Sequence, residues 1–204
     1  MEQIHELIFA TNNENKVNEI RAVLEDSYHI VSLVESGIFI DIPEPFDTIQ
    51  ENAVEKATVI YKLTGKDCFG EDTGLETEAL NGEPGVKSAR YAGDDRSFSK
   101  NITKLLNNLA GNENRRAQFR TVIALVIKGN CYTFEGICKG LIIAEERGNN
   151  GFGYDGVFVA DGATKTFGEM TMQEKNVFNH RRKAVDQLTD FLKKLNFKSL
   201  QTSI

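Results

Sequence analysis

Two long apolar segments that flank a glycine constrain the fold more than any other feature of the sequence. Residues 117–128 and 131–141 are separated by Gly129-Asn130. Glycine at the first central position of a two-residue connection is typical of a type II′ turn, so the segments predict a long antiparallel hairpin. Gly136 interrupts the alternation of the second segment and predicts a β-bulge there. The chain must therefore build a sheet that contains an antiparallel pair.

Helical and strand-like segments alternate along the rest of the chain. Short apolar runs predict buried strands at 7–10, 29–34 and 68–75, the last of which continues into a loop. Apolar residues at helical spacing predict helices just after Asn15, over 48–64 and 98–109, and from about Arg181. This order predicts a mixed-sheet α/β fold. Because the sequence has no internal repeat, low-complexity tract or long linker, we expect residues 1–204 to form one domain.

The charge balance and the apolar runs exclude several partners. The chain has 24 Lys and Arg against 30 Asp and Glu, so its net charge is −6. Non-specific nucleic-acid binding needs a basic surface, so we expect no nucleic-acid partner. The longest apolar run, 122–127, is far too short to cross a bilayer, so we also expect no membrane partner.

Cysteine usage and the N-terminal sequence indicate the compartment. The three cysteines, Cys68, Cys131 and Cys138, are odd in number and form no CxxC motif, which is typical of a reducing environment. The segment MEQIHELIFATNNENK has no basic region before its short apolar run, so it does not resemble a secretory signal. We therefore expect a cytoplasmic protein.

Glycines concentrate in two segments, residues 70–93 and 148–156, which together hold nine of the 17 glycines. Dense glycine is typical of left-handed turns and of backbone that lies against a ligand. Ordinary loop tips are the alternative interpretation. They explain the segment GNNGFGYDG poorly, because two aromatic residues and a carboxylate are embedded in it.

A polar loop follows the first predicted strand. Residues 11–15 (TNNEN) join that strand to a helix N-terminus, and Lys16 adds a positive charge. Free N–H groups and the helix dipole at such a terminus attract an anion. The loop is not a Walker A motif, and an asparagine-rich turn with a solvated lysine is the commoner interpretation.

Two adjacent carboxylates, Glu71 and Asp72, follow an apolar strand end within the strand-to-loop segment 68–75. Successive side chains of a strand point to opposite faces, so one carboxylate can enter a cleft while the other braces the loop. A hard cation such as Mg²⁺ prefers oxygen ligands of this kind. A pair of solvated turn carboxylates is an equally good alternative.

Two predicted helices carry polar residues that suggest contrasting roles. Thr48 and Glu51 have capping-box spacing, and Lys56 has the pattern of a solvated helix lysine, so none of the three requires a ligand. Residues 175–183 (KNVFNHRRK) instead place basic side chains at the N-terminus of the last helix, where the helix dipole repels cations. A bound anion would resolve that conflict, so we favour a functional site there.

These segments belong to a set of short motifs that follow one another in a fixed order from residue 10 to about residue 181. The motifs are residues 10–16 with Glu19, 51–53 with 56–57, 71–75, 80–86 with 88–90, 151–155, 165–169, 174–176 and 180–181. In this order they resemble the inosine/xanthosine triphosphate pyrophosphatases, which hydrolyse deaminated purine nucleoside triphosphates. The chain departs from that family's usual pattern at Asn12, Thr73, Gly156 and Asn179. None of these departures removes a charge or a base-reading side chain.

The resemblance implies an elongated, two-lobed mixed-sheet fold with a central nucleotide cleft, and a homodimer. It implies hydrolysis of ITP, dITP and XTP to the monophosphate and pyrophosphate, with Mg²⁺ as cofactor. The residues that it assigns to substrate binding are Thr11, Asn12, Asn13, Glu14, Asn15, Lys16, Lys56, Thr73, Phe152, Gly153, Tyr154, Asp155, Lys175, His180 and Arg181.

The same resemblance assigns catalysis to Asp72, as base, metal ligand or both. Metal ligands should be carboxylates, and we expect Asp72 and Glu44, with Glu51 and Glu71 open as alternatives for the second ligand. A non-hydrolysing nucleotide sensor and a phosphohydrolase for ordinary nucleotides are the alternative functions.

Base selectivity is expected from two residues near the last helix. Arg181 and a protonated His180 would both be hydrogen-bond donors, which suit the C6 keto oxygen of hypoxanthine or xanthine but not the amino group of adenine. Guanine also carries a C6 oxygen, so this argument predicts discrimination against ATP and leaves GTP unexplained.

Overall fold

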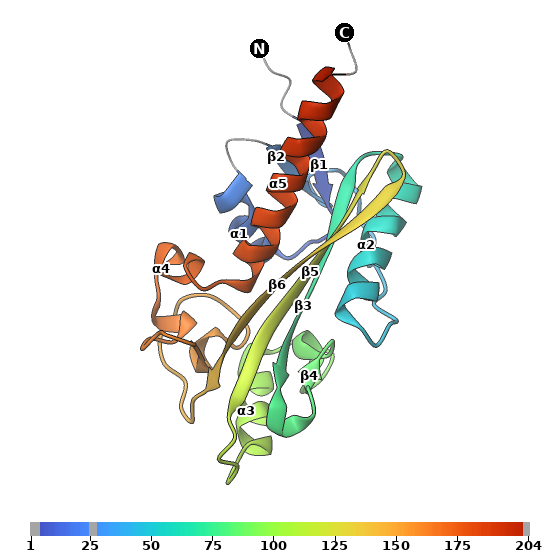
Figure 1. The fold of residues 1–204 in the computed structure, drawn as a ribbon. Coiled ribbons are helices and arrows are strands. Elements are labelled where there is room, and N and C mark those ends of the chain that lie inside the picture. The colour runs from blue at the N-terminus through green and yellow to red at the C-terminus, as the bar shows by residue number, and fades with distance from the viewer. Residues whose placement is uncertain (1–4, 25–27, 202–204) are drawn as a thin grey trace.

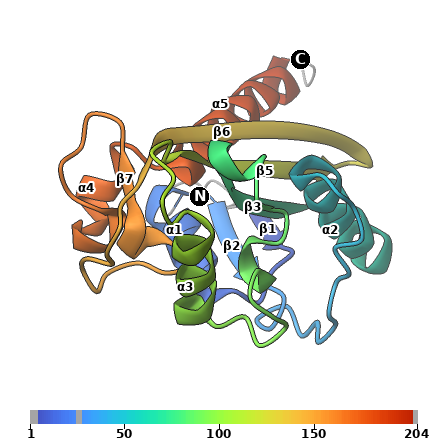
Figure 2. The same cartoon turned by 90° about the horizontal axis from the view of Figure 1, so that it is seen from below.

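The computed structural model describes residues 5–24 and 28–201, in which one mixed sheet carries helices on both faces (Figures 1 and 2). The seven strands of these residues lie in the order β2-β1-β3-β5-β6-β7, with β4 beside β3. They are β1 (His5–Phe9), β2 (Tyr28–Ser32), β3 (Cys68–Thr77), β4 (Pro84–Gly85), β5 (Arg116–Ile127), β6 (Asn130–Ile142) and β7 (Phe158–Ala160). β1 is parallel to β2 and β3, whereas the other pairs are antiparallel. The mixed-sheet α/β class is confirmed, and the two-lobed division stays a prediction.

Four of the α-helices among the described residues match the predicted ones, and the short α4 was not predicted. The helices are α1 (Glu14–Leu24), α2 (Ile49–Thr64), α3 (Phe98–Asn108), α4 (Met172–Asn176) and α5 (His180–Gln201). The predicted cap of α2 is confirmed, because the Thr48 hydroxyl accepts the Glu51 N–H at 3.1 Å. None of the helices in these ranges combines the length and hydrophobicity that a bilayer crossing requires.

Alternating side chains of the sheet supply two cores on opposite faces. Leu7 and Phe9 of β1 pack with α1 and α5, whereas Ile8 and the following Ala10 pack with α2. The period of two along a strand is the physical reason for this division. A third core surrounds Phe119 of β5 and joins α3 to β7 at the far end of the long hairpin (Figure 2).

The long hairpin of β5 and β6 is present, but its predicted turn type is wrong. Ile127 pairs with Asn130, so the two connecting residues are Lys128 and Gly129 rather than Gly129 and Asn130. Their φ angles are 49° and 78°. Two successive left-handed residues form a type I′ turn, which matches the twist of the flanking strands.

The predicted bulge at Gly136 is also wrong, because the residue pairs with Thr121 in an unbroken register. The glycine instead permits a close approach of α5. A Cβ atom at this position would lie 2.0 Å from the carbonyl oxygen of His180. The missing side chain therefore lets the first turn of α5 rest on β6, which fixes where His180 and Arg181 begin the helix.

The segment 68–75, predicted as a strand that leads into a loop, is strand throughout. β3 continues to Thr77 and pairs with β5 over its whole length. Glu71 and Asp72 therefore lie in the middle of the sheet, where backbone hydrogen bonds fix their positions. This rigid placement positions the candidate site.

Candidate functional site

A cavity of about 390 Å³ opens where β1 and β3 separate. The β1–β3 register ends at Phe9 and Phe69, and β4 pairs with β3 only from Leu75 onward. Among the described residues, no strand covers the edge of β3 between these two points. A break of this kind leaves a crevice beside the sheet, as at the switch points of other α/β folds.

The backbone hydrogen bonds of β3 show that its uncovered edge points toward the cavity. The Phe69 carbonyl accepts the Ala10 N–H at 2.8 Å, and the Leu75 N–H donates to the Ser88 hydroxyl at 2.8 Å. Between them, the Glu71 carbonyl accepts a hydrogen bond from Lys56 Nζ at 3.2 Å rather than from a strand. A helix lysine therefore occupies part of the gap that the neighbouring strands leave.

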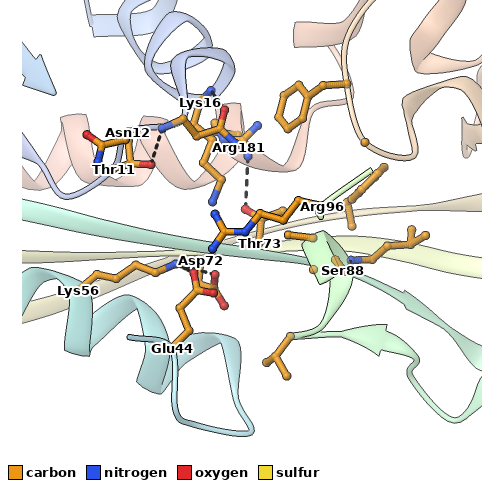
Figure 3. A pocket seen from close by; sticks show the side chains of 18 of the residues that line it. Thr11, Asn12, Lys16, Glu44, Lys56, Asp72, Thr73, Ser88, Arg96 and Arg181 are labelled. Carbon is orange, nitrogen blue, oxygen red and sulfur yellow. Dashed lines mark hydrogen bonds and ion pairs between the residues drawn. The ribbon is translucent and has the colours of Figure 1, made fainter. Parts of the chain in front are cut away.

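The cavity brings together most of the residues that the sequence assigns to the site. Predicted residues that line it are Thr11, Asn12, Asn13, Lys16, Glu44, Lys56, Asp72, Thr73, Phe152, Gly153, Tyr154, Asp155, Lys175, His180 and Arg181. Glu14 and Asn15 are exposed on the first turn of α1 and do not line it. Figure 3 shows Lys16 and Arg181 reaching in from one side and Lys56 from the other.

Asp72 and Lys56 form the first buried charge cluster. Lys56 Nζ lies 2.9 Å from Asp72 Oδ1 and 2.5 Å from Glu44 Oε1. Arg90 holds the other oxygen of Glu44 at 2.6 Å. Lys56 is only 7% exposed, so the pattern-based interpretation of a solvated lysine is wrong. Gly70 explains its burial, because a Cβ there would lie 2.4 Å from the Ala53 carbonyl and push α2 away from β3.

Glu71 and Arg181 form the second buried cluster on the opposite side of β3. Arg181 donates from Nε and from a terminal nitrogen to the two oxygens of Glu71, both at 3.0 Å. Arg181 also donates to Glu19. Lys175 Nζ lies 2.8 Å from Glu19 and 2.7 Å from Asp155. Carboxylates of the chain itself therefore compensate the basic side chains at the start of α5, where the helix dipole alone would repel them.

Burial and pairing shift the pKa values of these carboxyls in opposite directions. Burial raises the pKa of Asp72, and the attraction of Lys56 offsets this only in part. Burial alone would also raise the pKa of Glu19, but Arg181 and Lys175 outweigh it and lower the pKa to about 2. Arg181 and Lys16 likewise outweigh the burial of Glu71 and hold its pKa far below the usual range. Asp72 is therefore the more basic member of the Glu71–Asp72 pair.

His180 lies at the start of α5 as a neutral imidazole. Burial lowers its pKa well below the ordinary value, and the charges of Arg181 and Lys175 add to the effect. The expectation of a protonated His180 is therefore wrong. Its ring stacks on Phe119 with centroids 4.6 Å apart. Its Nδ1 is buried and has no hydrogen-bond partner among the described residues, which leaves one polar atom of the cavity wall unsatisfied.

The glycine-rich segment after β6 carries an aromatic wall. The Phe152 ring lies 5.4 Å from Lys175 Nζ and 5.8 Å from the Arg181 guanidinium. Its N–H donates to Asp155 Oδ2 at 2.9 Å, while the Tyr154 hydroxyl donates to the Ser88 carbonyl at 2.9 Å. These bonds hold an aromatic face at one end of the cavity, suited to stacking on a flat ring.

The first loop is shaped by its own side chains. The Thr11 hydroxyl accepts the Asn13 N–H at 3.1 Å, and Asn13 Oδ1 accepts the Lys16 N–H at 3.3 Å. Lys16 Nζ then turns toward β3 and lies 3.5 Å from Glu71. Burial lowers the pKa of Lys16, and Glu71 opposes this shift. The loop thus places a backbone turn and an ammonium group at the same cavity wall.

Several cavity residues were not predicted from the sequence. Ser88, Phe98, Asn101 and Arg96 line the cavity. Ser88 belongs to the motif of residues 88–90, which could have marked it as a site residue. Arg96 and Phe98 carry no signal in the sequence, because an arginine and an aromatic residue beside a predicted helix start are common surface features.

The donor set fits a divalent cation held jointly with a ligand. Asp72 and Glu44 both border the cavity and share Lys56, and Mg²⁺ commonly binds one or two protein carboxylates together with substrate phosphates. The described residues contain no group of three or more candidate ligands that could hold a metal ion alone. Glu71 is engaged by Arg181 and Glu51 by the α2 cap.

Comparison with known proteins identifies close relatives. The model of the Ham1 family matches residues 7–191. The chain is 50% identical to a dITP/XTP pyrophosphatase of Flavobacterium johnsoniae over 186 residues, which cover 91% of this chain and 97% of that protein. It is 50% identical to a dITP/XTP pyrophosphatase of Porphyromonas gingivalis over 190 residues, 93% of this chain and 98% of that protein. The solved structure of a HAM1 protein from Coxiella burnetii superimposes with a TM-score of 0.86, at 36% identity, and the match covers 94% of this chain and 100% of that chain.

Proposed function

The chain belongs to the Ham1 family, and on that premise we propose that it hydrolyses ITP, dITP and XTP to the monophosphate and pyrophosphate. The observation that carries this proposal is the arrangement of the cavity walls. A loop with Lys16 and a helix with Lys56 face Asp72 at one end, and Phe152 lies at the other. A phosphate chain and a flat base would be accommodated at these two ends.

Asp72 acts as the general base in the proposed reaction. Water attacks the α-phosphorus, and its proton passes to the Asp72 carboxylate. The bond from the α-phosphorus to its bridging oxygen breaks, and pyrophosphate leaves with the electron pair. Burial, which raises the pKa of Asp72, strengthens it as a base. Lys56, 2.9 Å away, favours the ionised form of the carboxylate and orients it within the cavity.

We propose Mg²⁺ as the cofactor, with Asp72 and Glu44 as its protein ligands. A bound Mg²⁺ would supply charge neutralisation and polarisation of the phosphoryl oxygens. The proposed binding residues of the first loop hold the phosphate chain, and Lys16 neutralises part of its charge. Arg90 keeps Glu44 turned toward Lys56 through its ion pair at 2.6 Å.

Base selectivity is proposed to come from the start of α5. Arg181 and Lys175 can only donate hydrogen bonds, so they suit the C6 oxygen of hypoxanthine and xanthine better than the amino group of adenine. The neutral His180 contributes a ring nitrogen that can donate or accept. A site that leaves polar groups unpaired against the wrong base can discriminate by roughly 10⁴-fold.

The test is a turnover assay of the full chain with ITP, XTP and ATP in the presence and absence of Mg²⁺, followed by phosphorus NMR. We expect pyrophosphate as the first product, and a kcat/KM for ITP and XTP well above that for ATP. Binding without turnover would indicate a nucleotide sensor. Orthophosphate and a diphosphate as first products, or equal rates with ATP, would indicate a phosphohydrolase of another kind.

We also propose a cytoplasmic homodimer, as the resemblance to the pyrophosphatase family implies. The three cysteines are free, which supports a reducing compartment. Exposed apolar side chains on the segment before α2 support a second contact surface: Phe39 is 79% exposed and Val34 54%. Sedimentation of the purified chain at several concentrations tests the dimer, and a monomer throughout would contradict it.

A further inference from the structure

Arg96 differs from the other cations of the cavity because it pairs with no carboxylate in the part of the chain that the structure describes. Lys16, Lys56, Lys175 and Arg181 are each within 4.0 Å of a carboxylate of the chain. Arg96 also lines the cavity, yet its side chain makes no ion pair or hydrogen bond with any described residue. Figure 3 shows the side chain extending into the cavity toward Asp72 and Thr73.

The ion-paired charges around the cavity compensate one another. The four paired cations and Arg90 bind five carboxylates, which belong to Glu19, Glu44, Glu71, Asp72 and Asp155. This set has no net charge, so it offers little attraction to a strongly anionic ligand beyond its local geometry. Asp41, an exposed residue that also lines the cavity, adds one negative charge but forms no ion pair with Arg96 among the described residues. Arg96 is therefore the positive charge that is available to a ligand without breaking an existing pair.

The backbone holds Arg96 in an unfavourable conformation. Its φ is +51°, a left-handed value that is strained for a residue other than glycine. The turn is fixed on both sides, because the Arg96 N–H donates to the Gly93 carbonyl at 3.4 Å and Ser97 caps α3. A conformation of this kind at a cavity wall is typical of a functional position.

Phe98 connects this turn to the opposite wall of the cavity. Phe98 also lines the cavity, and its ring centroid lies 6.2 Å from that of Phe152. The contact joins the start of α3 to the glycine-rich segment that carries the proposed base-stacking residue. Arg96 thus enters the cavity from the turn before α3, whereas Lys16 enters it from the start of α1, and a bound phosphate chain would contact both cations.

We propose that Arg96 binds the phosphate chain of the substrate from the α3 side of the cavity. This inference rests on the proposed pyrophosphatase function and adds a residue to that site. A guanidinium can bind phosphate oxygens through two parallel hydrogen bonds, whereas an ammonium cannot. The expected contribution is one charge-assisted contact, which corresponds to a change in affinity of about tenfold or more.

The experiment compares wild type with Arg96→Gln and Arg96→Asn, using Lys100→Gln as the matched control. Lys100 is an exposed cation on α3 that pairs with Asp95 and does not line the cavity. Inhibition constants of inorganic pyrophosphate and of inosine are measured against ITP hydrolysis with Mg²⁺ present. Both Arg96 variants should weaken pyrophosphate binding and raise the KM for ITP by about tenfold or more, while inosine binding and Lys100→Gln stay near wild type.

The melting temperature of the variants distinguishes a binding role of Arg96 from a structural one. Asparagine tolerates a left-handed φ better than arginine does, so Arg96→Asn should keep or raise the melting temperature while pyrophosphate binding falls. Unchanged pyrophosphate binding, an equal loss for inosine, or a loss that follows the melting temperature would overturn the assignment of Arg96. Failure of the wild type to hydrolyse ITP would instead contradict the proposed function.

Discussion

Glu71 and Asp72 are neighbours on β3, yet their carboxylates bind opposite sides of the molecule. Glu71 pairs with Arg181 of α5, and Asp72 pairs with Lys56 of α2. Strand alternation separates them, and their surroundings shift their pKa values in opposite directions. One carboxylate thereby anchors a helix while its neighbour remains available for chemistry.

We expect Asp72→Asn to reduce turnover of ITP by a factor of about 100 or more while the protein stays folded. The amide cannot take the proton of the attacking water, but it fits the same space. Steady-state kinetics and the thermal melt together check this prediction. Glu76→Gln, on the same strand and outside the cavity lining, serves as the control. A pure Asp72→Asn protein with near-normal turnover would remove Asp72 from the catalytic role.

In contrast to Asp72→Asn, Glu71→Gln should mainly lower the stability of the fold. The change leaves Arg181, which is 2% exposed, without its bidentate partner. Removing one member of a buried ion pair costs about 3–5 kcal/mol of unfolding free energy. Urea unfolding of Glu71→Gln beside Asp72→Asn measures the contrast. Equal destabilisation by the two substitutions would contradict the division of roles on β3.

His180→Phe should fold normally but lose base discrimination. Phenylalanine preserves the stack on Phe119, and the buried Nδ1 has no partner to lose among the described residues. We expect the ratio of kcat/KM for ITP over ATP to fall by about tenfold, as expected for the loss of one polar contact. An unchanged ratio would show that His180 supports the cavity only by packing.

Stability should fall in acid because of Glu19. Its pKa is lowered from 4.5 to about 2 by Arg181 and Lys175, which outweigh its burial. A carboxyl with a lowered pKa stabilises the fold above its unfolded pKa, and this contribution is lost as the pH falls from about 4.5 toward 2. The loss amounts to about 3 kcal/mol.

Glu19→Gln checks the acid prediction by chemical denaturation between pH 7 and pH 2.5. The variant should be less stable at pH 7 and should depend less on pH in the acid range. Glu14→Gln, on the exposed side of the same helix, should keep the wild-type profile. If the stability of the Glu19→Gln protein fell as steeply in acid as that of wild type, Glu19 would not be the source of the acid sensitivity.

Gly70→Ala should displace α2 and weaken both stability and activity. The added Cβ would lie 2.4 Å from the Ala53 carbonyl and 2.8 Å from the Lys56 Cβ. Overpacking of this kind costs about 1–3 kcal/mol, and a shifted Lys56 would orient Asp72 poorly. At Gly162 a Cβ would meet no neighbouring atom, but φ is +83°. Gly162→Ala therefore measures only the free-energy cost of placing alanine in a left-handed backbone conformation. Equal melting temperatures for the two variants would contradict the close packing of α2 on β3.

Local patterns in the sequence determined much of the fold. Apolar spacing predicted the longer helices and the central strands but not the short β4, β7 and α4. Thr48 and Glu51 predicted the cap of α2, and the two long apolar segments predicted the hairpin of β5 and β6. These features depend on hydrogen bonds and side-chain periods within a few residues, which the order of residues records directly. The motif order also predicted most of the residues that line the cavity.

Only the tertiary structure decided which charges face one another. Lys56 has the local pattern of a solvated residue, but Gly70, which has no side chain, lets α2 pack closely on the face of β3, and this packing buries Lys56. Arg181 meets Glu19 across 162 positions of the chain, and Arg96 remains unpaired among the described residues. Spacing along the chain cannot reveal such relationships, because the packing of helices against the sheet sets them, and the same packing sets the protonation of each group.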